Sequence, residues 1–144
     1  MHYKNPISIL VVIYVENTQR VLMLQRKDDP EFWQSVTGSL AEGETLQQTA
    51  IREVKEETGI DILAENLTLF DCQECVEFEI FPHFRYKYAQ NITHCTEYWF
   101  LLALPQECEP VLTEHLAFQW LPAKQAIQLT KSWNNSAAIA KYLT

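Results

Sequence analysis

The chain has 144 residues, of which 47% are hydrophobic, 12% aromatic and 21% charged, a composition that excludes a disordered chain and suits one globular domain over residues 1–144. Lys and Arg total 11 against 19 Asp and Glu, and no basic cluster is longer than two residues, so the net charge of −8 argues against nucleic acid as a partner. The longest apolar runs have seven residues, where a membrane-spanning helix needs about 20, and the N-terminus carries no signal-peptide pattern, so we expect a cytoplasmic protein with no membrane partner.

Apolar runs of two kinds predict a series of strands. Ile7–Val15 is rich in Val and Ile, which predicts a strand buried on both faces, and the polar stretch Glu16–Gln19 predicts a turn to its partner. Val76–Ile80 alternates apolar and acidic residues, as a half-exposed strand does. The expected strands are Ile7–Val15, Val21–Leu24, Phe32–Thr37, Leu67–Asp71, Val76–Ile80, Tyr98–Leu104 and Ala117–Leu121.

One strong helix is predicted in the first half of the chain, over Thr45–Thr58. Thr45 and Gln48 fit a capping box, in which each side chain satisfies an unpaired backbone donor. Gly59 follows where a left-handed residue commonly ends a helix. Two further helices are expected in the tail, Ala123–Leu129 and Asn135–Leu143. Strands around one central helix, with helices at the end, indicate an α/β (α+β) layered domain with a mixed sheet.

Carboxylates gather along one side of this central helix. Its apolar stripe consists of Leu46, Ala50, Ile51 and Val54. Glu53 and Glu57 lie at the edge of that stripe, with Glu56 beside them, so the three carboxylates are expected to face partly inward. Arg52 can pair with Glu56 but cannot neutralise the whole group. A solvated acidic face is the common reading of such a charge run, but the inward geometry favours a hard divalent cation with oxygen ligands.

The residues around this helix resemble a known sequence motif. Gly38, five residues, Glu44, seven residues and the segment Arg52–Ile60 match the Nudix box in full over 23 residues. The resemblance implies an α/β/α sandwich around a mixed β-sheet, with the box as a loop–helix–loop motif. It also implies hydrolysis of a diphosphate linked to another group, with Mg2+ as cofactor or Mn2+ in its place, so the expected partner is a small-molecule triphosphate. By position, Gly38 looks like the residue that opens the loop near the metal, and Glu44 like the partner of Arg52 that fixes the helix against its loop.

The same resemblance implies roles for the acidic residues. Glu53 and Glu57 look like metal ligands, and Glu56 like a further ligand or the base that activates water. Glu114 precedes the last expected strand, where the family often places another carboxylate, and it is either an extra ligand or base or a plain loop residue. A nearby carboxylate can take a proton from water whose attack on phosphorus breaks the phosphoanhydride.

Stretches outside the box narrow the resemblance to one bacterial Nudix enzyme of folate biosynthesis. They are Pro6–Val12, Arg20–Asp29, Phe32–Ser39, Val76–Phe81, Thr113–Ala117 and Lys131–Asn134. This likeness implies hydrolysis of 7,8-dihydroneopterin triphosphate to the monophosphate and diphosphate. The alternatives are a Nudix enzyme acting on (d)NTPs or another nucleoside diphosphate derivative, and a ligand-binding module of the same fold without catalysis.

Three residues outside the box are candidates for phosphate binding. Arg26 closes the second expected strand, where it either binds phosphate or pairs with Asp28 or Asp29. Lys4 is a weaker candidate, because lysines near a terminus are usually solvated. Thr37, next to the loop, either donates to substrate or simply ends a strand.

A pocket for a flat ring is expected near the end of the Val76–Ile80 strand. Phe78, Ile80 and Phe81 are candidates to line it, although core packing is the commoner role of such residues. Glu79, or Glu77, can accept hydrogen bonds from ring N–H groups.

The sequence gives weaker indications of function for the remaining polar residues. Ser132 lies between the two tail helices with Trp133 and Asn134, either as a helix cap or as part of a pocket wall. Three histidines lack ligand-like spacing and receive no role, namely His83, His94 and His115.

Overall fold

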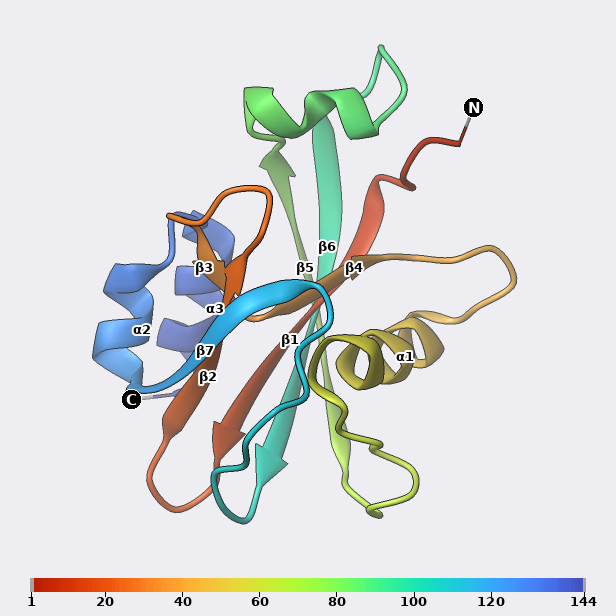
Figure 1. The fold of residues 1–144 in the computed structure, drawn as a ribbon. Helices are drawn as coiled ribbons and strands as arrows, with labels where there is room; N and C mark the ends of the chain where they lie inside the picture. Colours follow the sequence, from red (N-terminus) through yellow and green to blue (C-terminus); the bar gives the residue numbers. More distant parts are fainter. Residues whose placement is uncertain (1, 144) are drawn as a thin grey trace.

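The computed structural model describes residues 2–143 as one seven-stranded mixed sheet with helices on both faces (Figure 1). The strands are β1 (Ile7–Val15), β2 (Arg20–Arg26), β3 (Trp33–Gln34), β4 (Val36–Ser39), β5 (Leu69–Glu79), β6 (His94–Leu104) and β7 (His115–Pro122). The helices are α1 (Leu46–Thr58), the 3-10 helix η1 (Pro82–Lys87), α2 (Ala123–Leu129) and α3 (Trp133–Tyr142). Within residues 2–143, no helix is long and apolar enough to cross a membrane.

Strand β1 is the centre of the sheet. It runs parallel to β6 along its whole length, and it pairs antiparallel with β4 at its beginning and with β2 near its end. The strand order is β3-β2-β1-β6-β5, with β4 added on β1 and β7 on β2. The predicted bounds of this strand, Ile7–Val15, are confirmed, as is its burial on both faces.

Alternate residues of β1 supply two separate cores. Ile9 and Val11 pack with Val54 of α1 on one face, whereas Leu10 and Val12 pack with residues of α2 and α3 on the other. Complete burial of each such side chain stabilises the fold by about 1.5–3 kcal/mol. This arrangement is the α/β/α sandwich that the Nudix resemblance implies, and it packs α1 against one face of the sheet.

The ends of α1 form as predicted. Thr45 Oγ1 accepts a hydrogen bond from the Gln48 N–H at 3.1 Å, and Gln48 Oε1 accepts one from the Thr45 N–H at 2.9 Å. Gly59 ends the helix with a φ of 80°, a left-handed conformation that costs least for glycine.

The prediction of a single strand over Phe32–Thr37 is wrong. The segment forms two short strands that pair with different neighbours, β3 with β2 and β4 with β1. Ser35 lies between them, and its N–H donates to Asn135 Oδ1 at 2.8 Å. A side chain from α3 thus satisfies the backbone group that the change of partner leaves unpaired.

The prediction of separate strands at Leu67–Asp71 and Val76–Ile80 is also wrong, because both belong to β5. The pairing of β5 with β6 shifts register between Asp71 and Cys75. Gln73 takes a positive φ of 54° there, and its N–H donates to Asp71 Oδ1 at 2.8 Å. The interruption in the apolar pattern is therefore a β-bulge within one strand.

Smaller differences lie at the ends of elements. β6 begins at His94 rather than Tyr98, α3 begins at Trp133 rather than Asn135, and η1 was not predicted. η1 lies across one end of β5 and β6 (Figure 1). Its Phe84 joins a small third core with Phe32 and Ile80, so η1 walls off one end of the sheet.

Candidate active site

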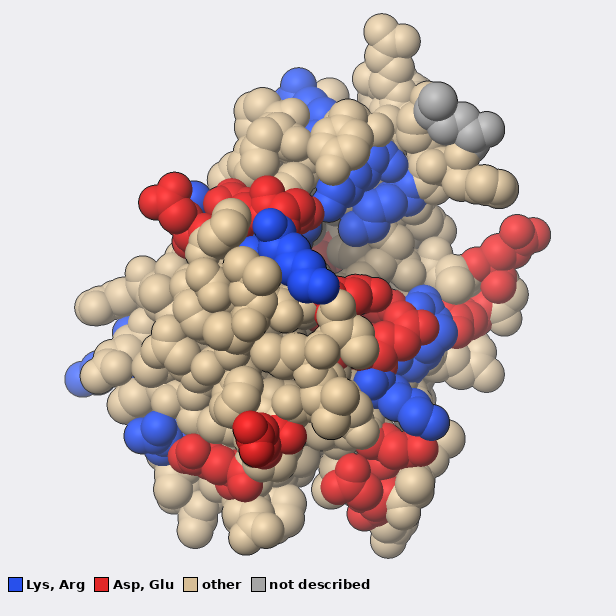
Figure 2. Space-filling view, in the orientation of Figure 1, with Lys and Arg blue, Asp and Glu red and all other residues tan. Residues whose placement is uncertain are grey.

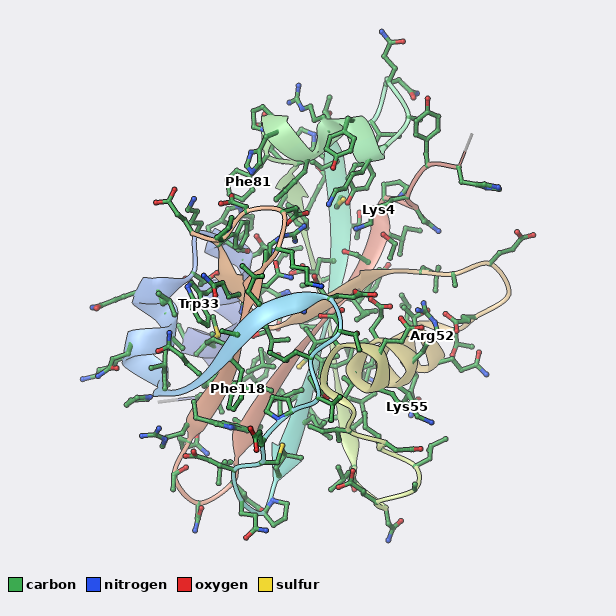
Figure 3. All side chains as sticks on the ribbon, viewed as in Figure 1. Lys4, Trp33, Arg52, Lys55, Phe81 and Phe118 are labelled. Atoms are coloured by element: carbon green, nitrogen blue, oxygen red, sulfur yellow. The ribbon has the colours of Figure 1, made fainter. Side chains whose placement is uncertain are left out.

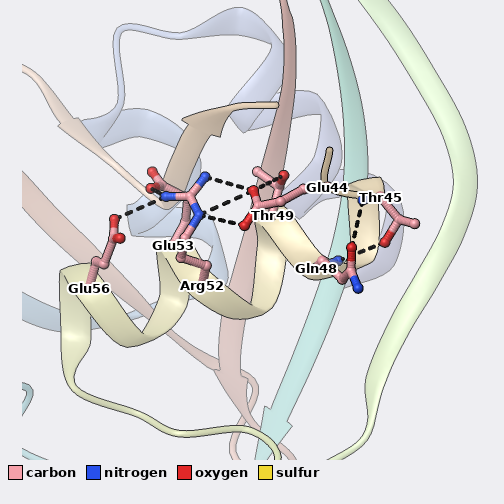
Figure 4. A network of polar contacts seen from close by, with 7 residues as sticks. All are labelled: Glu44, Thr45, Gln48, Thr49, Arg52, Glu53 and Glu56. Atoms are coloured by element: carbon pink, nitrogen blue, oxygen red, sulfur yellow. Dashed lines mark hydrogen bonds and ion pairs between the residues drawn. The ribbon is translucent and has the colours of Figure 1, made fainter. Parts of the chain in front are cut away.

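The loop before α1 is tied to the helix by one arginine. Arg52 Nε donates to Glu44 Oε2 at 2.9 Å, and Nη1 donates to Glu53 Oε1 at 2.7 Å and to Glu56 Oε2 at 3.1 Å (Figure 4). Glu44 also accepts from Thr49 Oγ1 at 2.7 Å. The pairing of Arg52 with Glu44 that the motif implies is therefore present, and the same guanidinium orients the carboxylate of Glu53.

Glu53 and Glu57 are neighbouring carboxylates on α1, the first partly buried and the second buried. Glu57 is 2% exposed, and its Oε1 has no hydrogen-bond partner within the described chain. Burial, followed by the negative charges of Glu53 and Glu114, raises the pKa of Glu57 well above its ordinary value. Burial and the neighbouring Glu56 raise the pKa of Glu53 to about 7, against the opposing charge of Arg52. Glu53 is therefore compensated in part by Arg52, whereas Glu57 has no hydrogen-bonded cation among the described residues.

The other two carboxylates are differently placed. The side chain of Glu56 is 46% exposed and paired with Arg52. The prediction that it faces partly inward is therefore wrong, because it lies toward solvent. Glu114 is exposed and lines the same cavity as Glu53 and Glu57. Among residues 2–143, no three His, Cys, Asp or Glu side chains already converge as metal ligands. A buried and a partly buried carboxylate with an unpaired oxygen nevertheless suit a hard divalent ion, which completes its shell with water and phosphate oxygens.

Gly38 lies where the tip of Glu53 approaches β4. A Cβ atom at Gly38 would overlap the carboxyl group and Cγ of Glu53. The glycine is therefore required by the close approach of this carboxylate to the backbone, which places the loop-opening residue directly at the acidic group.

A charged cavity of about 390 Å³ opens over these carboxylates. Lys4, Arg26 and Lys87 line it together with Glu53 and Glu57. In Figure 2, basic and acidic side chains face each other across a hollow, and Figure 3 shows Lys4 near η1 and Arg52 on α1. Burial, followed by the charges of Lys87 and Arg26, lowers the pKa of Lys4. A group of crowded cations beside crowded carboxylates suits a polyanion bound together with a metal ion.

Arg26 makes the ion pair that its sequence position allowed. Nε and Nη2 donate to Asp28 Oδ1 and Oδ2, each at 2.7 Å, and Nη1 donates to Gln34 Oε1 at 3.1 Å. The hydrogen bonds from Arg26 hold the pKa of Asp28 well below its usual range. The guanidinium carbon also lies 4.3 Å from the ring centroid of Phe84. Thr37 Oγ1 accepts from Gln34 Nε2 at 3.2 Å, so the wall that carries Arg26 and Thr37 is held in place.

An apolar cavity of about 420 Å³ lies next to the charged one. Phe78, Ile80 and Phe81 all line it. Ile80 is 3% exposed and packs in the third core, whereas Phe81 is 37% exposed and makes an edge contact with Phe32 at 5.5 Å between ring centroids. The segment therefore contributes both a core residue and a more exposed aromatic side chain to this wall, and the binding of a flat ring there stays a prediction.

The remaining sequence-predicted residues lie at the rim of this apolar cavity. Glu79 lines it, but its side chain is 63% exposed and pairs with Arg85 at 3.0 Å. Ser132 caps α3 by accepting from the Asn135 N–H at 3.1 Å and also lines the cavity. Ser132 therefore has both of the positions proposed for it as alternatives, the helix cap and the pocket wall. Trp133 lines the cavity with 56% exposure.

Sequence reasoning missed a buried carboxylate in the apolar cavity. Glu97 is 2% exposed and accepts hydrogen bonds from Asn134 Nδ2 at 2.7 Å and Trp99 Nε1 at 3.1 Å. Burial raises the pKa of Glu97 to about 7, although these two donors favour its charged form. An acidic residue directly before the apolar run Tyr98–Leu104 was the signal that could have drawn attention to it.

His115 was also missed. It is 8% exposed, and its Nε2 lies 3.7 Å from Glu57 Oε1, too far for a hydrogen bond. Burial, followed by the charge of Arg26, lowers the pKa of His115 to about 4, so the ring is neutral near pH 7 and does not neutralise Glu57. Its position directly after Glu114 was the available signal.

The two cavities form one cleft with two chemically different halves. Their shared lining residues are Lys4, Arg26, Gln34, Thr37, Gly38, Ser39 and Lys87. A ligand with a flat heterocycle at one end and phosphates at the other can therefore lie across this shared wall, with the ring near Glu97 and the phosphates near Glu53 and Glu57.

The whole chain resembles characterised proteins. It is 63% identical over 141 residues to the dihydroneopterin triphosphate diphosphatase of Escherichia coli K12, covering 98% of this chain and 94% of that protein. It is 62% identical over 143 residues to the protein of the same name from Haemophilus influenzae, covering 99% of this chain and 90% of that one.

Solved structures agree with these relatives. The E. coli dihydroneopterin triphosphate pyrophosphohydrolase superposes with a TM-score of 0.97 at 62% identity, over 99% of this chain and 98% of that one. A Caenorhabditis elegans Ap4A hydrolase shares the fold at a TM-score of 0.71 and 22% identity, over 94% of this chain and 93% of that one. The NUDIX domain model matches residues 4–143. The chain belongs to the Nudix family.

Proposed function

We propose that this protein hydrolyses 7,8-dihydroneopterin triphosphate to dihydroneopterin monophosphate and diphosphate, a step of folate biosynthesis. The observation that carries the proposal is identity of 62% to 63%, over nearly the whole chain, to bacterial enzymes named for that substrate. The divided cleft supports it, because an apolar half with a buried acceptor and a charged half lined by cations match a pterin ring joined to a triphosphate.

Divalent metal ions are typical cofactors of Nudix hydrolases, and we assign Mg2+ to this site, with Mn2+ able to replace it. Glu53 and Glu57 would hold the ion, since Glu57 is buried with Oε1 unpaired within the described chain and the partly buried Glu53 lies beside it. Glu56 and Glu114 are further oxygen donors at the edge of the same group. When bound, such an ion neutralises phosphate charge and makes an attacking water more acidic.

The protein's own side chains then divide the remaining work. Lys4, Arg26 and Lys87 bind phosphate oxygens in the charged half of the cleft, and Thr37 can donate to the same chain of phosphates. The exposed carboxylate of Glu56 or Glu114 accepts the proton of the attacking water. Neither residue is buried as Glu57 is, and it is burial that raises the pKa of Glu57 and disfavours its charged form.

Two residues keep the acidic group in a single arrangement. Arg52 orients Glu53 through its 2.7 Å hydrogen bond, and Gly38 leaves room for the carboxylate. Displacement of a reacting or ligating group by about 1 Å can cost a hundredfold in rate, so both residues act by positioning.

A substrate panel tests this function. Purified protein with Mg2+ is given dihydroneopterin triphosphate, dGTP, dATP, ADP-ribose and diadenosine tetraphosphate, and the products are followed by phosphorus NMR. We expect diphosphate from the pterin substrate at a kcat/KM at least about tenfold above the nucleotides. A higher kcat/KM for any nucleotide would overturn the substrate assignment, and tight binding without turnover of any compound would indicate a non-catalytic module.

A further inference from the structure

The floor of the apolar half carries a row of polar side chains from three adjacent strands. In the parallel pairing of β1 with β6, Ser8 is the partner of Glu97. In the antiparallel pairing of β1 with β4, Ser8 is the partner of Ser39. Directly paired residues of neighbouring strands project to the same face, and all three line the 420 Å³ cavity. The fold therefore places a carboxylate and two hydroxyl groups side by side inside an apolar pocket.

Glu97 and Ser8 are both buried residues, and each has an oxygen to which no described residue is hydrogen-bonded. Both hydrogen bonds that Glu97 receives from the described residues end on Oε1. Ser8 is 8% exposed, and its Oγ has no partner within the described chain. Buried polar atoms without partners cost free energy, so they are uncommon unless a ligand or a water completes them. Neither residue faces the carboxylates of α1, so the hydrolytic chemistry does not account for them.

The orientation of Glu97 is fixed by a chain of hydrogen bonds. Ser132 Oγ donates to Asn134 Oδ1 at 2.8 Å, which turns the amide nitrogen of Asn134 toward Glu97. Trp99 Nε1 holds the same carboxylate oxygen from β6. Asn134, Trp99 and Ser132 are thus positioning residues, and they leave the second oxygen of the carboxylate free for a donor in the pocket.

We infer that Glu97, with Ser8 beside it, recognises the edge of a heterocycle that carries a ring N–H next to an exocyclic amino group, as a 2-amino-4-oxopyrimidine ring does. Because Oε1 of Glu97 already accepts two hydrogen bonds, Oε2 is the acceptor for this edge. Its two lone pairs can take the ring N–H and the amino group together, a pair of donors that an adenine or hypoxanthine edge does not supply. Ser8 can donate to or accept from a neighbouring polar atom of the ring. The inference rests on the proposed function, and it names the residues that select the pterin end of the substrate.

Strong discrimination follows from the burial of these groups. A ligand without the amino group would leave one acceptor position of the Glu97 carboxylate unfilled in an apolar pocket, and sites built around such a hydrogen bond reject the analogue that lacks it. The aromatic side chains of Phe78 and Phe81 along the wall favour a flat ring but do not distinguish one ring from another.

Calorimetric titration with GMP and IMP tests this inference directly. The two nucleotides differ only in the 2-amino group, and neither contains a phosphoanhydride to be hydrolysed. We expect the unmodified protein to bind GMP at least about tenfold more tightly than IMP. In Glu97→Gln the ratio should fall close to one, because the amide presents a donor to the donors of the ring while its oxygen still accepts from Asn134 and Trp99.

Two variants complete the design. Ser8→Ala should weaken GMP binding a few-fold, and Glu109→Gln, the same chemical change on an exposed residue outside both cavities, should leave the ratio unchanged. Because the ratio is taken within one protein sample, partial unfolding of a variant does not alter it. Equal binding of GMP and IMP by the unmodified protein, or an unchanged ratio in Glu97→Gln, would overturn the inference.

Kinetics separate this inference from the proposed function. Glu97→Gln should raise the KM for dihydroneopterin triphosphate about tenfold or more with a smaller change in kcat, since the residue lies away from the reacting phosphates. Failure of the unmodified protein to hydrolyse that substrate would remove the proposed function, whereas an unchanged KM in an active Glu97→Gln would remove only the role of Glu97.

Discussion

The carboxyl group of Glu53 lies against the backbone of Gly38, in space that the side chain of any other residue would occupy. We therefore expect Gly38→Ala to move the tip of Glu53 and to lower kcat/KM about tenfold to a hundredfold. The free energy of unfolding should change little, because Gly38 does not have a positive φ and alanine can adopt its backbone. Steady-state kinetics and thermal unfolding of the same samples check both parts.

Gly43→Ala is the matched control for this substitution. Gly43 has a φ of 81°, and a Cβ there would meet no atom within 4 Å. Alanine should cost roughly 1 kcal/mol of stability through backbone strain and leave kcat/KM nearly unchanged. Loss of activity in both variants to the same degree would show that loop strain, rather than the contact with Glu53, explains the effect.

Glu57→Gln should abolish the stabilisation of the protein by Mg2+ without destabilising the metal-free fold. The amide replaces a carboxyl group whose charged form is disfavoured by burial, so the metal-free variant should be at least as stable as the unmodified protein. Turnover with Mg2+ should fall by at least about a hundredfold. Added Mg2+ should raise the melting temperature of the unmodified protein, and chelation should reverse this, whereas Glu57→Gln should respond to neither. Unchanged turnover in both Glu57→Gln and Glu53→Gln would contradict the assigned metal site.

The features that were predicted correctly from the sequence depend on local interactions. The capping box, the left-handed Gly59 and the carboxylates of α1 all depend on neighbours within one helix, whose spacing is visible in the sequence. β1 was predicted at its true bounds because a strand buried on both faces leaves a continuous apolar run.

Long-range partners explain what was missed. The change of strand at Ser35 depends on Asn135, which is 100 residues away, and the buried Glu97 depends on Asn134, which is 37 residues away. A bulge such as that at Gln73 looks like a gap between two strands until the partner strand is known. The residues that shape the apolar half of the cleft are therefore defined by tertiary contacts rather than by spacing.

Arg52→Lys tests whether one planar guanidinium is needed in the middle of α1. Arg52 bonds to Glu44, Glu53 and Glu56 through different nitrogens, a pattern that a single ammonium cannot reproduce. We expect kcat/KM to fall about tenfold, with a loss of only about 1 kcal/mol in stability, because the side chain is 33% exposed and its ion pairs are partly screened. Lys55→Gln on the exposed side of α1 should change neither quantity.

The metal-free protein should lose stability as the pH rises from about 4.5 to 7. In this range the folded state keeps a proton on Glu97, whose pKa is raised to about 7, while the unfolded chain has released it. The folded form therefore binds more protons, and its free energy of unfolding falls with pH by at most roughly 3 kcal/mol for this group. Glu53 acts in the same direction, and His115 acts in the opposite one, because its pKa is lowered to about 4.

Comparison of the unmodified protein with Glu97→Gln isolates the contribution of this one group. Urea unfolding at about pH 5 and about pH 8, with chelator present, should give a smaller decrease for Glu97→Gln, since its amide does not titrate and the other groups are common to both proteins. Glu109→Gln should retain the full decrease, because that residue is exposed. Equal decreases in all three proteins would mean that Glu97 is charged in the folded state throughout this range, held so by Asn134 and Trp99.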